Sequence, residues 1–291
     1  AVFVATSQTD SSMQYIIGPT DNSGYAYVDE LPYDTYTVKE TVFPDGYTSS
    51  GKSEWTVTVS SANNGVVTIN AVNELKKGSF TLKKTSEDGK VSDISFRIQG
   101  SGYDKTLTTN AKGEISVSGM TPGKYTATEL TPNVYEPQQS QTFTVAPGEN
   151  TVINFYNTLK RGDLKVTKTA EDGLVEGMYF KLSGTSDSGM KVLSFAETDK
   201  NGVAVFEDIP ITTKNPLTLE EINTPDKYVV PPAQSAVIEW NKVTEKSFNN
   251  TLKKFNATVT KADAESSEAQ GDATLAGAVY GLYNNGTLVD T

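Results

Sequence analysis

The chain has 291 residues and contains neither cysteine nor histidine. Without cysteine it can form no disulfide framework and no thiolate metal site. Without histidine it lacks the usual general base, the usual zinc ligand and every catalytic pair of serine or cysteine with histidine. Its acidic turns also lack the spacing of an EF-hand calcium loop. We therefore expect a protein that performs no ordinary hydrolytic chemistry and uses no cofactor and no metal.

Long apolar runs and basic clusters are missing as well. No stretch approaches the roughly eighteen residues of a membrane span, so we expect no membrane insertion in this fragment. The formal charge of −11 argues against nucleic acid as a partner. With 36% hydrophobic and 21% charged residues, the composition is that of a folded globular protein, long enough for two or three domains.

Strand signals dominate what is present. Short runs rich in Val, Thr, Tyr and Ile alternate between apolar and polar residues, and Gly, Pro, Asn and Asp interrupt them about every eight to twelve residues. This spacing predicts an all-β protein built of antiparallel sandwiches.

One strand with a lysine on its apolar side recurs along the chain. The segment FTLKKTSEDG at 80–89 returns as LKVTKTAEDG at 164–173 and, more weakly, as ATVTKADAES from 257. Because residues of one parity share a face of a strand, these lysines face the same way as apolar neighbours such as Phe80 and Leu82. The three lysines are Lys84, Lys168 and Lys261. An amine repeated on the apolar face calls for a specific role.

Two further strands repeat with an inward polar residue at matching intervals. The glutamate strands are YTVKETVFPDGY, YTATELTPNVY and LTLEEINTPDKY, and the asparagine strands are INAVNELKKG, INFYNTLKRG and FNNTLKKF. Parity alone selects Glu221 over its neighbour Glu220, and Lys84 over Lys83. The selected residues are Glu40, Glu129 and Glu221 on the glutamate strands, and Asn73, Asn157 and Asn250 on the asparagine strands.

The three landmarks divide the chain into an array of repeats. We expect a first unit at 1–75 without its lysine strand, complete units at 76–160 and 161–253, and the opening strands of a further unit at 254–291. Glu40, Asn73 and Lys261 are then orphan halves of the constellation. The linkers between units are short, which predicts a semi-rigid rod.

A single Lys–Glu–Asn constellation has ordinary explanations. It can be a buried ion pair with a hydrogen-bonded asparagine, which often contributes little to stability. Alternatively, all three residues can lie at strand ends, where inward side chains still reach water. Recurrence in two complete and two partial units favours a chemical role instead.

The chemical hypothesis is a covalent cross-link. In an apolar pocket, desolvation lowers the pKa of lysine and raises the pKa of glutamic acid, so that both are neutral together. The amine can then attack the asparagine carboxamide while the glutamic acid relays protons, and ammonia leaves. Contact between the groups supplies effective molarities of about 10⁵ M or more. Such a reaction works once per site, so the chain is not an enzyme in the usual sense.

These motifs resemble the Cna B-type, prealbumin-like (SpaA-type) repeats of Gram-positive surface adhesins and pilins. The resemblance lies in K-T-x-E-D-G at Lys84 and Lys168, E-T-x-x-P-x-G-Y at 40–47, L-x-G-A-x-Y at 275–280 and the repeated N-x-L-K. Segments 132–135 and 225–228 depart from the P-x-G-Y pattern. The resemblance implies tandem Greek-key, reverse immunoglobulin-like sandwiches. It also implies isopeptide bonds from Lys84 to Asn157 and from Lys168 to Asn250, with Glu129 and Glu221 as catalysts.

The expected function is that of a structural stalk in a cell-wall-anchored, extracellular surface protein of a Gram-positive bacterium, whose anchor lies outside this fragment. Its partners would be neighbouring repeats, with a host matrix protein or glycan bound through other domains, and the chain is expected to be monomeric. Two alternatives stay open. One is a pilus shaft subunit of the same fold, and the other is a ligand-binding module that uses the longer segment at 185–195 of the third unit.

Overall fold

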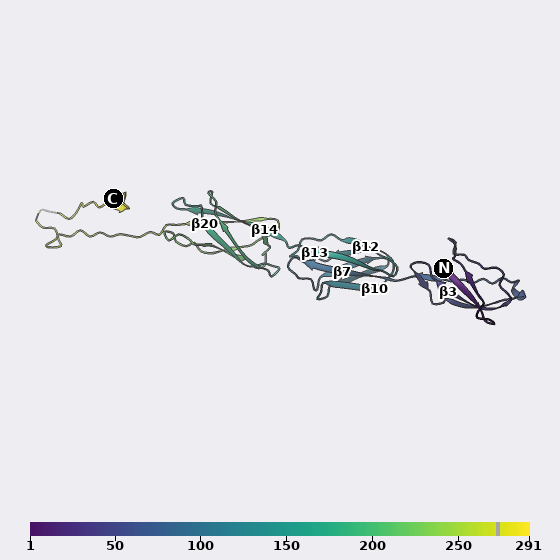
Figure 1. The fold of residues 1–291 in the computed structure, drawn as a ribbon. Helices are drawn as coiled ribbons and strands as arrows, with labels where there is room; N and C mark the ends of the chain where they lie inside the picture. Colours follow the sequence, from purple (N-terminus) through teal and green to yellow (C-terminus); the bar gives the residue numbers. More distant parts are fainter. Residues whose placement is uncertain (272–273) are drawn as a thin grey trace.

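A computed structural model describes residues 1–271 and 274–291, which form β-strands and one short 3₁₀ turn, η1 (Ser61–Asn63). Positions 272 and 273 belong to the predicted opening of a further unit and lie outside the described residues. Three β-sheet units, of which the second and third are complete sandwiches, follow one another along an extended rod, and the C-terminal stretch continues beyond them (Figure 1). The prediction of an all-β tandem array is confirmed. We call residues 1–75 unit 1, residues 76–160 unit 2 and residues 161–253 unit 3.

Unit 2 is a sandwich of a three-stranded and a four-stranded sheet. The lysine strand β7 is central in the smaller sheet, antiparallel to β10 and parallel to β13, the last strand of the unit. The larger sheet has the order β12-β11-β8-β9 and is antiparallel throughout. The strands are β7 (Gly78–Ser86), β8 (Ser95–Gly100), β9 (Tyr103–Thr108), β10 (Glu114–Met120), β11 (Gly123–Glu129), β12 (Gln141–Val145) and β13 (Asn150–Asn157).

Unit 3 repeats this topology. Its sheets have the orders β17-β14-β20 and β16-β15-β18-β19, and the lysine strand β14 is again parallel to the last strand, β20. The strands are β14 (Arg161–Ala170), β15 (Tyr179–Thr185), β16 (Lys191–Glu197), β17 (Val203–Pro210), β18 (Leu217–Ile222), β19 (Gln234–Ala236) and β20 (Val243–Asn250).

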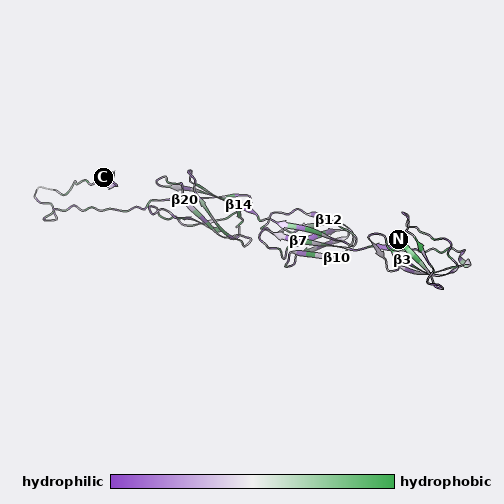
Figure 2. Ribbon diagram, viewed as in Figure 1, coloured by the Kyte–Doolittle hydropathy of each residue, from purple (hydrophilic) through white to green (hydrophobic). Residues whose placement is uncertain are grey.

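The core of each sandwich follows from strand alternation. On β7, Phe80 and Leu82 are fully buried whereas Lys83 is exposed. Figure 2 shows hydrophobic and hydrophilic residues mixed along the strands in this way. Thirteen buried hydrophobic residues make up the core of unit 2 and fifteen that of unit 3. Glycine is required at Gly78, the first residue of β7, and at Gly162, the second residue of β14, because a Cβ there would lie 2.4 Å and 2.1 Å from a backbone carbonyl oxygen of the facing loop.

Unit 1 keeps one sheet of this architecture. Its four-stranded sheet, of order β2-β1-β3-β5, corresponds to the larger sheet of units 2 and 3, and a short ladder joins β4 to β6. No counterpart of the central lysine strand is present among its residues, and its core has three fully buried hydrophobic residues. The strands are β1 (Val2–Ser7), β2 (Gln14–Ile17), β3 (Asp34–Val42), β4 (Tyr47–Ser49), β5 (Glu54–Val59) and β6 (Asn73–Leu75).

The C-terminal stretch contains one hairpin, formed by β21 (Leu282–Asn284) and β22 (Thr287–Asp290). The strand expected around Lys261 does not form, and Lys261 is exposed. None of the described residues forms a helix that could cross a membrane.

Candidate functional site between the first and last strands

In unit 2 the three selected residues converge from three strands. Lys84 lies near the end of β7, Glu129 ends β11 and Asn157 ends β13. In the parallel ladder Lys84 lies opposite Phe155 and Asn157 lies opposite Ser86. Lys84 and Asn157 are therefore diagonal neighbours on the same inward face, within reach of long side chains.

The contacts within this group are short and its members are buried. The Asn157 Nδ2 donates to Glu129 Oε1 at 2.6 Å, and the Lys84 Nζ lies 3.8 Å from Glu129 Oε2. The Lys84 amine also donates to its neighbouring carbonyl, that of Thr85, at 2.6 Å. Lys84, Glu129 and Asn157 are 2%, 5% and 0% exposed. The glutamate thus stands between the amine and the carboxamide.

Unit 3 contains the same group with nearly the same geometry. The Asn250 Nδ2 donates to Glu221 Oε1 at 2.8 Å, and the Lys168 Nζ lies 3.4 Å from Glu221 Oε2. The exposed fractions are again 2%, 5% and 0% for lysine, glutamate and asparagine. Glu220, the neighbour that parity placed outside, forms a surface ion pair with Lys181.

Aromatic rings make the site apolar. In unit 2, Phe96 lies opposite Glu129 on β8, and its ring meets that of Phe155 edge to face at 4.9 Å. Unit 3 has the equivalent pair, Phe180 and Phe248, at 5.0 Å. Desolvation by this burial lowers the pKa of Lys84 and of Lys168 and raises the pKa of Glu129. In unit 2 this burial therefore disfavours the charged form of both the amine and the carboxyl group.

Two buried oxygens of the Lys–Glu–Asn group in each complete unit have no hydrogen-bond partner, namely Glu129 Oε2 and Asn157 Oδ1 in unit 2, and Glu221 Oε2 and Asn250 Oδ1 in unit 3. Leaving such atoms unpaired costs about 1–3 kcal/mol each. A half turn of the Asn157 carboxamide would exchange its nitrogen and oxygen. A protonated Glu129 could then donate to the carbonyl oxygen across the same 2.6 Å.

The orphan halves behave differently. In unit 1 the Asn73 Nδ2 donates to Glu40 Oε1 at 2.8 Å, and Glu40 is 2% exposed. Glu40 Oε2 and Asn73 Oδ1 are buried without a hydrogen-bond partner, and no lysine forms an ion pair with Glu40 within the described chain. Lys261, the third orphan, lies in the exposed C-terminal stretch.

The segment at 185–195 is the end of a hairpin between β15 and β16. Its turn is directed at unit 2, where the Lys90 amine donates to the Ser188 carbonyl oxygen. Ser186 and Ser188 are buried. The longer middle of unit 3 therefore takes part in the contact between two units.

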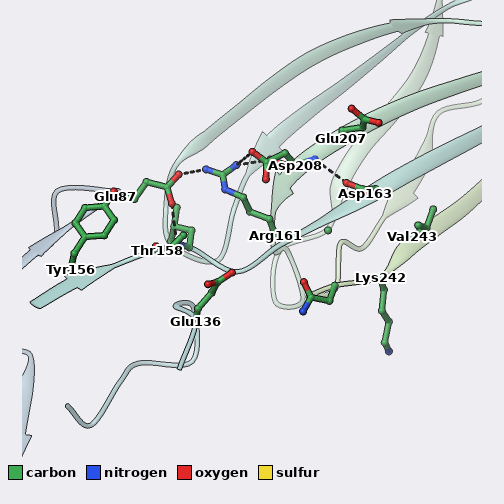
Figure 3. Close-up of a pocket in the computed structure, with 13 residues that line it drawn as sticks. Glu87, Glu136, Tyr156, Thr158, Arg161, Asp163, Glu207, Asp208, Lys242 and Val243 are labelled. Carbon is green, nitrogen blue, oxygen red and sulfur yellow. Dashed lines mark hydrogen bonds and ion pairs between the residues drawn. The ribbon is translucent and has the colours of Figure 1, made fainter. Parts of the chain in front are cut away.

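Arg161 links the same two units. Its guanidinium lies between Glu87 of unit 2 and Asp208 of unit 3, and pairs with both (Figure 3). Glu87, the neighbouring Asp88 and Tyr135 make contacts beside the reactive group that were not predicted from the sequence. The available signal was the acidic pair in K-T-x-E-D-G, which both complete units share and the segment at Lys261 lacks.

No cluster of three potential metal ligands is present in the part of the chain that the structure describes. The fold and site instead define a class: tandem β-sandwich domains that each bury a lysine, a glutamate and an asparagine between their first and last strands. The family model of the SpaA prealbumin-like fold domain matches residues 1–75, 78–159 and 162–252. The chain belongs to this family, and the resemblance drawn from its motifs is confirmed.

Three relatives illustrate the family. Serine-aspartate repeat-containing protein F of Staphylococcus epidermidis is 26% identical over 238 residues, which cover 71% of this chain and 15% of that protein. The structure of the Bacillus anthracis TIE protein matches with a TM-score of 0.52 and 17% identity, over 86% of this chain and 49% of that one. The Streptococcus agalactiae minor pilin GBS52 has a TM-score of 0.31 and 14% identity, over 63% of this chain and 100% of the pilin. The likeness in fold rests on the TIE protein.

Proposed function

We propose that this chain is a stalk segment of a Gram-positive cell-surface adhesin, strengthened by isopeptide bonds that its own units form. The observation that carries the proposal is the same buried Lys–Glu–Asn group in both complete units, with the glutamate in contact with both partners. Membership of a family that includes pilins and adhesin repeats supports an extracellular, wall-anchored location. The role is structural, and each site reacts once.

The proposed reaction balances without any added reagent. The neutral Lys84 Nζ attacks the Asn157 carboxamide carbon, while Glu129 donates its proton to the carbonyl oxygen. Glu129 then takes a proton from the attacking nitrogen and delivers it to the leaving amide nitrogen. The C–N bond of the carboxamide breaks and ammonia departs. The hydroxyl proton of the intermediate returns to the Glu129 carboxylate, and a neutral Lys84–Asn157 amide remains. Lys168, Glu221 and Asn250 perform the same steps in unit 3.

The position of the link gives it a mechanical role. Tension that enters unit 2 through β7 would cross the bond from Lys84 to Asn157 and leave through β13, so the residues between them carry no load. The link closes a loop of 73 positions in unit 2 and 82 in unit 3. By the loop-entropy relation for disulfides, each bond would stabilise its unit by about 4–5 kcal/mol.

Intact mass tests the proposal. Each bond removes one ammonia, roughly 17 Da, so the purified chain should weigh two ammonia molecules less than its sequence. Lys84→Ala and Glu129→Ala should each abolish the ammonia loss of unit 2, and Lys168→Ala should abolish that of unit 3, so that each variant loses only one ammonia. Lys83→Ala, which changes the exposed neighbour, is the matched control and should keep both losses. A wild-type mass equal to the plain sequence would rule the proposal out.

A further inference from the structure

The acidic pair of K-T-x-E-D-G lies directly beyond the reactive lysine in both complete units. Glu87 and Asp88 follow Lys84 by three and four positions, and Glu171 and Asp172 follow Lys168 at the same distances. The cross-linking reaction proposed above uses neither carboxylate. Each of them nevertheless contacts a strand that carries one of the other two reactive residues.

The glutamate of the pair binds the asparagine strand. The Glu87 backbone N–H donates to the Asn157 carbonyl oxygen at 2.9 Å, and the Leu159 N–H donates to Glu87 Oε2 at 2.9 Å. In unit 3 the corresponding distances are 3.0 Å from Glu171 N to the Asn250 carbonyl and 2.7 Å from Leu252 N to Glu171 Oε2. The backbone on both sides of the reactive asparagine side chain is thereby held against the lysine strand.

The aspartate of the pair binds the continuation of the glutamate strand. The Tyr135 hydroxyl donates to Asp88 at 2.9 and 3.0 Å, and in unit 3 the Tyr228 hydroxyl donates to Asp172 at 2.6 Å. Tyr135 lies six positions after Glu129. Both tyrosines are buried, at 3% and 0% exposure. Burial, together with the hydrogen bond to Asp88, raises the pKa of Tyr135, so the hydroxyl keeps its proton for this bond.

A third contact joins the segment after the glutamate strand to the segment after the asparagine strand. Tyr135 forms an isolated antiparallel bridge with Leu159, and Tyr228 forms one with Leu252. The three segments that follow the lysine, the glutamate and the asparagine are therefore joined pairwise, one step beyond the reactive group itself. Unit 1 retains one of these contacts, between Tyr47 and Leu75, and there Tyr47 is 38% exposed.

We infer that Glu87 and Asp88, like Glu171 and Asp172, are positioning residues for isopeptide formation. They fix the end of the lysine strand against both partner strands and so hold the amine at the distance from which it reacts. Attack on an unactivated amide depends on such contact, and a displacement of about 1 Å costs about 100-fold in rate. This inference rests on the proposed cross-linking reaction.

The experiment compares rates within one molecule. The full chain is made in a cell-free system, samples are denatured at intervals, and peptide mapping by mass spectrometry measures the linked fraction in each unit. Asp88→Ala and Glu87→Ala should each slow the bond of unit 2 by about 10- to 100-fold and leave the bond of unit 3 unchanged. Glu87→Gln retains an acceptor for the Leu159 N–H and should restore most of the rate.

A second measurement separates positioning from folding. In a Lys84→Ala background, where unit 2 cannot form its bond, hydrogen exchange of β13 should show unit 2 still folded after Asp88→Ala. Unchanged rates in unit 2 would overturn the inference, and so would loss of the fold in that background. If the wild type loses no ammonia, the proposed reaction itself fails. If it loses two and the variants react at the normal rate, the reaction stands and the positioning role fails.

Discussion

Units 1 and 2 share a four-stranded sheet and a buried glutamate that accepts a hydrogen bond from an asparagine side chain. The distance from Asn Nδ2 to Glu Oε1 is 2.8 Å in unit 1 and 2.6 Å in unit 2. They differ in the lysine strand. With that strand, the core of unit 2 has thirteen buried hydrophobic residues, whereas that of unit 1 has three. The Glu–Asn half of the site therefore forms without the lysine, and the second sheet does not.

The reason is the central place of the lysine strand in the smaller sheet. β7 pairs with β10 on one side and with β13 on the other. In unit 1 the residues 66–72, which precede Asn73 as most of β13 precedes Asn157, form no strand. The strand thus supplies the buried lysine and the middle of a sheet, and the acidic pair that follows it contacts the segments beyond both partner strands.

The largest predicted difference between the units is mechanical. When the chain is pulled by its ends, unit 1 should extend fully, by about 3.4 Å per residue or roughly 250 Å for its 75 residues. Units 2 and 3 should not lengthen between the lysine and the asparagine of each site, because the proposed covalent bond would carry the load. Single-molecule force spectroscopy measures these lengths.

Lys84→Ala is the variant that should make unit 2 behave like unit 1 under force. A new extension step is then expected, of about 3.4 Å for each of the 73 positions between residues 84 and 157. Unit 3 in the same molecule is the control. Full extension of units 2 and 3 in the wild type would refute the load path.

Strand alternation explains why so much of this comparison could be predicted from the sequence. A period of two places Lys84, Glu129 and Asn157 inside and Lys83 outside, and burial in the structure agrees at each of these positions. The repeat intervals located the counterparts in unit 3. Where two adjacent residues had the same charge, as Glu220 and Glu221 do, parity still separated the surface residue from the buried one.

Contacts that depend on loop conformation could not be predicted this way. Tyr135 and Leu159 lie beyond the regular strands, where no periodicity assigns a partner, so their contacts with Asp88 and Glu87 emerged from the structure. The stretch around Lys261 shows that a strand-like sequence pattern alone does not make a strand. It has the alternation of a strand, yet a strand forms only against a partner that satisfies its backbone groups.

A smaller effect is expected in the pH dependence of stability. Lys84→Ala leaves Glu129 buried with Asn157 alone, as Glu40 is with Asn73. Desolvation raises the pKa of Glu129 above its ordinary value of 4.5, and the change removes a cation that lowers it. Above pH 4.5 the unfolded chain loses this proton while folded unit 2 keeps it. The free energy of unfolding should therefore fall as pH rises, by up to about 1.4 kcal/mol per pH unit.

Hydrogen exchange of the β13 amides, measured at several pH values and corrected for the intrinsic exchange rate, gives this slope. The decline should stop once the pH passes the folded-state pKa of Glu129, because both states are then ionised. The double variant Lys84→Ala, Glu129→Gln removes the titrating group and should flatten the slope. An unchanged slope in the double variant would assign the effect to other carboxylates.

The smallest predicted effect concerns the two junctions between units. Arg161 and Lys77 each follow a site asparagine by four positions. Arg161 pairs with Glu87 across the junction of units 2 and 3 and with Asp208 inside unit 3 (Figure 3). Lys77 instead donates to the Thr121 hydroxyl inside unit 2, at 3.2 Å. Arg161→Ala should broaden the distribution of angles between units 2 and 3, and Lys77→Ala should broaden the distribution of angles between units 1 and 2 less.

Because the side chains of Arg161 and Glu87 are both partly exposed, Arg161→Ala should lower the free energy of unfolding by no more than about 1 kcal/mol. Distances between spin labels on neighbouring units report the angles, and equal broadening by both changes would show that Arg161 does not hold the junction.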